Sequence, residues 1–230
     1  MATLHSKNAA RLTGLFYLAL AVTGAAGFLT IRPMLFAAGD PAATLAHLDD
    51  HLALAKAGVV LELLVVLTQA LAAAGFYRLF RGNDPVNAAG IAAFGLVNSV
   101  VILASAAMLG AAVEVAGRPF GDAASTVQLL HLVSGHLWTV GGLFFGLWLI
   151  PMGRCVLGSG PRVLGWLLVV GGVGYILNTF ASYVTPAVAD FLVVPATAGE
   201  LWMIGWLLVR GFSGRELSGV REKTPAIAAG

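Results

Sequence analysis

Charged residues are scarce in this chain, and cysteine is almost absent. Asp, Glu, Lys and Arg make up 10% of the 230 residues, whereas a soluble domain carries about 25%. The single cysteine, Cys155, excludes a disulfide within the chain, and one thiolate cannot build a metal site by itself. The composition therefore excludes an ordinary soluble domain and a disulfide-stabilised one.

Most of the sequence consists of long apolar runs, and its mean hydropathy is +0.90. A helix needs about 20 apolar residues to cross a bilayer, and these runs lack the alternating pattern of a barrel. We therefore expect an all-α integral membrane protein, a bundle of six transmembrane helices at about residues 10–31, 56–77, 87–115, 127–152, 163–184 and 191–209. They form one domain over residues 1–211, and we expect the polar segment 212–230 to be a disordered cytoplasmic tail.

The first apolar run could instead belong to a cleaved signal peptide, since Lys7 and Arg11 precede it. Its length of about 20 residues exceeds the 7–15 residues typical of such a segment. A retained helix is therefore the preferred interpretation.

The distribution of positive charge predicts the orientation. If both termini are cytoplasmic, only Arg32, Lys56 and Arg118 of the 13 Lys and Arg residues lie outside. Because Lys and Arg accumulate on the cytoplasmic side, we expect an N-in/C-in topology.

A short amphipathic helix is expected on the outer surface, before the second membrane helix. Asp40 and Pro41 have the residue types of an N-cap and a first helical position. Leu48 lies on the apolar face, whereas His47 and His51 lie on the polar one. The i, i+4 spacing of these histidines can hold zinc, but two histidines on a solvated face usually bind nothing, so we expect no metal and no cofactor.

Two glutamates, Glu62 and Glu200, interrupt runs that otherwise suit lipid. A carboxylate in a bilayer costs several kcal/mol unless it is protonated, paired or facing a polar cavity. Counting 1.5 Å per helical residue from the outer ends places both in the outer half of the membrane. At similar depth the count places further polar residues, which we expect to line the same outward-facing pocket: Tyr175, Asn178, Ser182, His131 and Gln69.

Two features leave alternatives open. The last helix could be kinked at Pro195 or could begin there. The carboxyl groups could also serve only to tie helices together, as hydrogen-bonded parts of the core.

Several short motifs together resemble a family of bacterial six-helix membrane proteins defined only as a domain of unknown function. The motifs lie at residues 11–17, 144–147, 161–165, 174–178 and 199–211. The resemblance implies an acid at Glu62, an Asp or Asn at Asn178 and the Gly-Glu pair at Gly199 and Glu200 as one group. It also implies the bacterial plasma membrane. The link at residues 158–161 is shorter than in relatives, on the side away from the pocket.

Three functions are compatible with these features. The first is binding or chemical transformation of a small amphiphilic ligand, of lipid or isoprenoid type, with Glu62 and Glu200 as acid and base. The second is a proton- or ion-coupled transporter that uses the same carboxyl groups. The third is a non-catalytic membrane sensor or partner subunit with a structural polar core. Membrane lipids are the expected partners, and no nucleic acid is expected.

Overall fold

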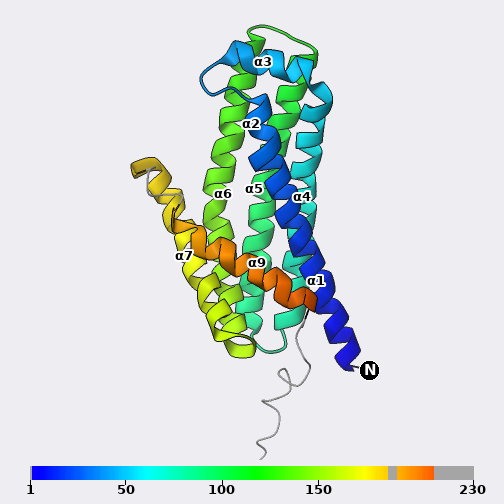
Figure 1. Ribbon diagram of the computed structural model, residues 1–230, viewed down its shortest axis with the longest axis vertical. Helices are drawn as coiled ribbons and strands as arrows, with labels where there is room; N and C mark the ends of the chain where they lie inside the picture. Colours follow the sequence, from blue (N-terminus) through cyan, green and yellow to red (C-terminus); the bar gives the residue numbers. More distant parts are fainter. Residues whose placement is uncertain (1, 186–190, 210–230) are drawn as a thin grey trace, which may run out of the picture.

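The computed structural model describes residues 2–185 and 191–209, with side chains from residue 7 onward. Within these residues every regular element is helical, in the order α1 (Ala2–Gly24), η1 (Ala25–Ile31), α2 (Arg32–Leu35), α3 (Pro41–Asp50), α4 (Leu52–Phe80), α5 (Pro85–Gly117), α6 (Ala123–Ser159), α7 (Arg162–Val184) and α9 (Val194–Val209). Figure 1 shows α4, α5 and α6 along the long axis, with α3 across one end. α1 packs on α4, and α7 packs on α6. The expected all-α architecture is confirmed.

Among the described residues, five helical segments are long and apolar enough to cross a membrane: Lys7–Leu35, Leu52–Phe80, Pro85–Gly117, Ala123–Ser159 and Arg162–Val184. The sixth, α9, is apolar but has 16 residues. At 1.5 Å per residue it is about 24 Å long, short of a hydrocarbon core of about 30 Å. Large apolar side chains such as Val60 and Leu67 are more than half exposed, which suits a lipid-facing exterior. The tail expected at 212–230 lies outside the described residues.

Three aspartates cap helices at their N-termini. Asp40 accepts a hydrogen bond from the Ala43 N–H, so the expected helix start at Asp40 and Pro41 is confirmed. Asp84 caps α5, and hydrogen bonds from Asn87 hold the pKa of Asp84 below its usual range. Asp122 caps α6, and hydrogen bonds from Ser125 lower its pKa in the same way.

The first helix does not end at residue 31, as the sequence had suggested. It continues through the π-helix η1 and through α2, up to Leu35. The Arg32 N–H bonds the Gly27 carbonyl, five residues back. Pro33 lacks an N–H and its ring would clash with the carbonyl four residues back in an α-helix. The wider π-turn before it lets the helix continue.

The last helix begins far from the end of α7. A Cβ atom on Gly174 would lie 2.0 Å from the Leu192 carbonyl oxygen, and one on Gly171 would lie 2.4 Å from the Ala196 Cα. Only glycine permits this approach, so α9 starts beside the middle of α7. It then crosses the half of the bundle distant from α3 (Figure 1). α9 begins at Val194, so Pro195 lies in its first turn, and a turn at Val193 separates α9 from the helical residues Phe191 and Leu192.

The buried apolar residues form two separate clusters. The larger one fills the half distant from α3 and includes Tyr17, Phe76 and Trp148. The smaller one lies beneath α3 and includes Leu35 and Leu48. Polar side chains occupy the level between them.

Candidate functional site

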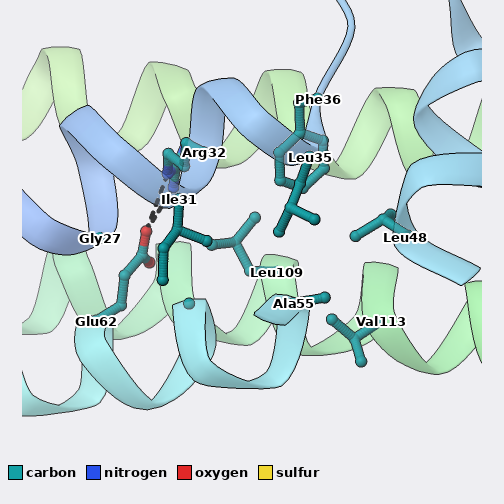
Figure 2. A pocket seen from close by; sticks show the side chains of 11 residues that line it. Gly27, Ile31, Arg32, Leu35, Phe36, Leu48, Ala55, Glu62, Leu109 and Val113 are labelled. Carbon is teal, nitrogen blue, oxygen red and sulfur yellow. Dashed lines mark hydrogen bonds and ion pairs between the residues drawn. The ribbon is translucent and has the colours of Figure 1, made fainter. Parts of the chain in front are cut away.

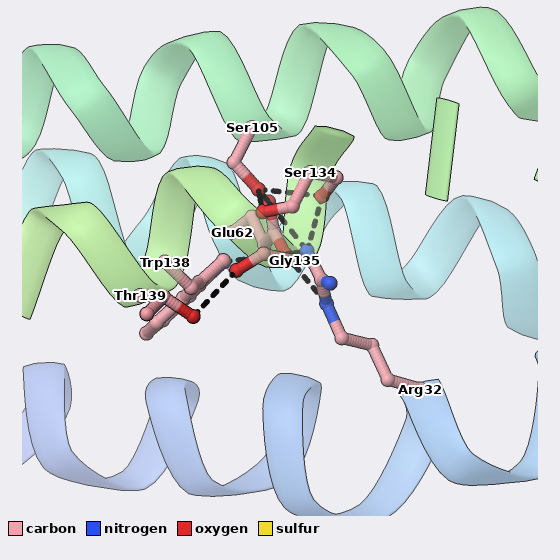
Figure 3. A network of polar contacts seen from close by, with 7 residues as sticks. All are labelled: Arg32, Glu62, Ser105, Ser134, Gly135, Trp138 and Thr139. Atoms are coloured by element: carbon pink, nitrogen blue, oxygen red, sulfur yellow. Dashed lines mark hydrogen bonds and ion pairs between the residues drawn. The ribbon is translucent and has the colours of Figure 1, made fainter. Parts of the chain in front are cut away.

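An ion pair joins Arg32 of α2 and Glu62 of α4 (Figure 3). Arg32 Nη2 lies 2.6 Å from Glu62 Oε1, and Nε lies 3.1 Å from the same oxygen. The two side chains are 8% and 3% exposed, and within the described part of the chain they form the only ion pair. Burial of either charge alone would be costly, so each accounts for the other's presence.

Ser105, Ser134 and Trp138 complete the surroundings of this pair. Ser105 Oγ donates to Glu62 Oε2 at 2.9 Å, and Trp138 Nε1 donates to Oε1 at 3.1 Å. Arg32 Nη2 also donates to the hydroxyls of Ser105 and Ser134, which lie 2.7 Å from each other. We call these five residues the Arg32 layer. Four helices meet in it, and both Glu62 oxygens are bonded.

One edge of the guanidinium remains open. Arg32 Nη1 has no hydrogen-bond partner among the described residues. The guanidinium lies 5.3 Å from the centroid of the Phe28 ring, a cation–π contact. Phe28 in turn packs on Trp138, with centroids 4.9 Å apart. The aromatic rings therefore hold Arg32 in place while leaving two N–H donors unused.

A narrow crevice adjoins the ion pair (Figure 2). Arg32 and Glu62 lie at one end of it, and Leu48 and Val113 lie at the other. Its remaining lining is apolar or small: Gly27, Ile31, Leu35, Phe36, Ala55, Gly58 and Leu109. The volume is about 10 Å³, room for about one water molecule. The crevice thus combines one polar end with an apolar remainder.

Glu200 lies elsewhere, on α9. It accepts a hydrogen bond of 2.7 Å from the hydroxyl of Tyr17 on α1. No cation pairs with it among the described residues. The Tyr17 ring packs edge-on against Trp148 and Phe76, with centroids 5.3 and 5.6 Å away. Tyr17 and Glu200 form a second polar site, here the Glu200 site, which connects the first and last helices.

The two carboxyl groups therefore do not share one depth, and the expected common layer is wrong. Phe76, beside Tyr17, follows Glu62 by 14 residues on α4, about 21 Å along the helix. Trp148 follows Trp138 by ten residues on α6, about 15 Å. The error arises because depth in the last helix was counted from the membrane surface, whereas α9 begins beside the middle of α7.

Gln69 and Asn98 lie between these two sites. Asn98 Nδ2 donates to Gln69 Oε1 at 2.9 Å. Both are buried. Gln69 follows Glu62 by seven residues on α4, and Asn98 precedes Ser105 by seven residues on α5. Gln69 therefore belongs to an intermediate level, about 10 Å from the Arg32 layer.

Of the three polar residues expected to line the pocket from α7, Tyr175, Asn178 and Ser182, only Tyr175 lies near the Glu200 site. Tyr175 interacts electrostatically with Glu200 and packs on Phe145, with centroids 5.0 Å apart. Ser182 Oγ donates to the Asn178 backbone carbonyl at 2.8 Å. In the described part of the structure, neither Asn178 nor Ser182 contacts a carboxyl group.

The histidines divide as follows. His131 stacks on Phe36 at 3.8 Å and interacts electrostatically with Arg32, so it adjoins the Arg32 layer. His136 turns away and lies 3.4 Å from the Tyr183 hydroxyl. His47 and His51 are exposed on α3 and at its end, and the described residues contain no cluster of three metal-ligating side chains.

Sequence reasoning missed Arg32 and Tyr17 as site residues. Arg32 was assigned to an external loop, although residues 33–38 continue the uncharged run beyond it. Tyr17 and Glu200 each lie in one of the motifs that carried the family resemblance, at 11–17 and 199–211. That coincidence was the one signal that could have joined them.

Comparison with known proteins identifies the chain at family level. The model of a family described as "Domain of unknown function (DUF4386)" matches residues 12–211. No curated protein and no solved structure matches the chain.

Proposed function

Because the chain belongs to the DUF4386 family, whose description names no activity, we propose a function from the site itself. The protein is a multi-pass membrane protein that binds a small amphiphilic molecule, of lipid or isoprenoid type, beside Arg32 and Glu62. The polar head of the ligand bonds Arg32, and its apolar part follows the crevice toward Leu48 and Val113.

One observation carries this proposal. Arg32 lies at the end of a crevice whose other walls are apolar, and its Nη1 has no hydrogen-bond partner among the described residues. Ligand sites typically combine an apolar lining with a few placed polar groups. Since Glu62 already neutralises Arg32, an uncharged acceptor such as a carbonyl or hydroxyl oxygen suits this edge without adding an unpaired charge.

The crevice must widen before a ligand can enter, because its volume is about 10 Å³. The wall formed by η1 and α2 is the natural moving part. It rests on the smaller apolar cluster, and segments with few buried apolar contacts open at low free energy. Gly27 and Gly58 line the crevice where η1 meets α4, so no large side chain blocks their separation.

Catalysis by Glu62 is less well supported than binding. Both of its oxygens accept hydrogen bonds, and Arg32 is paired with it. A general acid or base must reach the proton that it transfers, and Glu62 is occupied within the protein. Because both carboxyl oxygens of Glu62 are bonded within the protein, the second candidate function is that of a non-catalytic partner subunit, in which these polar residues serve only as a structural core.

We propose further that the chain has six crossings with both termini cytoplasmic, in the plasma membrane of a bacterium. Arg32 lies in the bundle and not in a loop, which leaves Lys56 and Arg118 as the external positive residues under this orientation. The positive-inside bias is then stronger than the sequence alone suggested. The crevice would open toward the outer half of the bilayer.

Filling the crevice tests the binding proposal. Val113→Phe adds bulk at the apolar end, whereas Val100→Phe adds the same bulk on α5 at a side chain that is 65% exposed. Native mass spectrometry of each purified protein, with lipid analysis of the retained adducts, measures occupancy. We expect a bound amphiphile in the unmodified protein and in Val100→Phe, and its loss in Val113→Phe. Equal adducts in all three, or none in the unmodified protein, would refute binding in the crevice.

A further inference from the structure

Three deeply buried polar atoms between the two carboxyl groups have no hydrogen-bond partner among the residues that the structure describes. They are Gln69 Nε2, Asn98 Oδ1 and Trp148 Nε1, and their residues are 1%, 5% and 0% exposed. A buried polar atom left unpaired costs about 1–3 kcal/mol. Folded proteins satisfy nearly all such atoms, with protein groups or with ordered water.

A different assignment of the amide groups does not remove the problem. As placed, Asn98 Nδ2 donates to Gln69 Oε1. If both amides were turned over, Gln69 Nε2 would donate to Asn98 Oδ1, and the other donor and acceptor would be unpaired. One bond is therefore made in either arrangement, and two polar atoms always need a partner from elsewhere.

The three atoms lie at levels between the Arg32 layer and the Glu200 site. Gln69 and Asn98 lie about 10 Å from the Arg32 layer. A Cβ atom on Gly95 would lie 3.0 Å from Trp148 Nε1, and Gly95 is one turn from Asn98, a rise of about 5 Å. Trp148 in turn contacts the ring of Tyr17, whose hydroxyl binds Glu200.

We propose that buried water occupies this interval and connects the two carboxyl sites as a proton path. Water bonded to Asn98 Oδ1, Gln69 Nε2 and Trp148 Nε1 would satisfy all three atoms, and two to four polar partners are typical of a buried water. The chain ends at the hydroxyls of the Arg32 layer on one side and at Glu200 on the other.

The transfer step needs no co-reactant. At each link one O–H bond breaks as a new one forms on the neighbouring oxygen, so a single proton moves and no electrons change hands. At one end Ser105 passes the proton to Glu62 Oε2, because its hydroxyl can accept from the chain while it donates to that oxygen. Glu200 suits the other, because its described bond occupies Oε1 and leaves Oε2 for the proton.

Radiolytic footprinting of the unmodified protein in lipid nanodiscs tests for the water. X-ray radiolysis of bound water oxidises adjacent side chains even when bulk solvent cannot reach them. After correction for the higher intrinsic reactivity of indole, we expect Trp148 to be labelled well above Phe76, which is equally buried but carries no polar atom. Labelling of Trp148 at the level of Phe76 would overturn the proposal, and this result requires no variant to fold.

Proton transfer is tested separately, by hydrogen–deuterium exchange at the Glu200 carboxyl. Infrared difference spectra against Glu200→Gln isolate its signal. We expect exchange to slow several-fold in Asn98→Leu and in the double variant Asn98→Leu/Gln69→Leu. Ser99→Ala is the matched control, because the Ser99 hydroxyl bonds only the Gly95 carbonyl of its own helix. Unchanged exchange in the leucine variants would overturn the path even if Trp148 is labelled, and neither result depends on an amphiphile in the crevice.

Discussion

Replacing Glu62 by leucine should destabilise the protein more than any other single change to a charged residue. The substitution removes the counter-ion of Arg32, whose side chain is buried and only 8% exposed. Trp138 Nε1 loses its acceptor at the same time, whereas the Ser105 hydroxyl can still bond Ser134. Shape is roughly kept, so the loss is electrostatic and not a packing defect.

The magnitude follows from the pairing. Removing one partner of a buried ion pair costs about 3–5 kcal/mol, because the remaining charge stays desolvated. If Arg32 is also replaced, by methionine, no charge remains to be compensated. The double variant Arg32→Met/Glu62→Leu should then unfold within about 1 kcal/mol of the unmodified protein, or be more stable.

A double-mutant cycle measures this, with equilibrium unfolding in mixed micelles followed by circular dichroism. Glu114→Leu serves as control, because Glu114 is exposed on α5 and surface changes are usually within about 0.5 kcal/mol. An additive cycle, or a cost below about 1 kcal/mol for Glu62→Leu, would show that the ion pair does not form in the membrane.

Two further predictions concern packing and capping. Gly171→Val should lower the free energy of unfolding by about 1–3 kcal/mol through overpacking against α9, since a Cβ there would lie 2.4 Å from the Ala196 Cα. Gly110→Ala should have no such effect, because the space around Gly110 is open. Thermal unfolding compares the two variants, and equal shifts in Tm would contradict the placement of α9. Asp84→Ala should lower the free energy of unfolding by about 1 kcal/mol, because the N-cap of α5 is lost. Hydrogen bonds lower the pKa of Asp84 in the folded state. The stabilisation by Asp84 is therefore present above its unfolded pKa of about 4 and is lost as pH falls through its folded pKa. Unfolding free energies of both proteins measured across that acidic range check the sign, and a difference that grows on acidification would contradict it.

Local and compositional rules predicted the all-helical architecture and the start of α3. Asp40 caps α3 as expected, and the amphipathic face of that helix is buried at Leu48 and exposed at His47. These features depend on residues within one or two turns of each other, which is the range over which sequence patterns carry information.

Contacts between segments far apart in the chain could not be predicted from the sequence. The partner of Glu62 is 30 residues away and the partner of Glu200 is 183 residues away. Counting depth along each helix assumes that all helices begin at a membrane surface, and α9 does not. Counting charges assumes that each Arg lies in a loop, and Arg32 does not. Both assumptions failed where the backbone departs from an ordinary straight helix.

The π-helix η1 fixes the rotational phase between the two parts of the first helix. Each turn from Ala25 to Ile31 contains about one residue more than an α-turn. If the same residues were wound as an α-helix, everything after them would rotate by about 100° around the helix axis. Arg32 would then leave its layer although no residue of the layer had changed. The π-helical winding of this segment is therefore as much a determinant of the ion pair as the two side chains that form it.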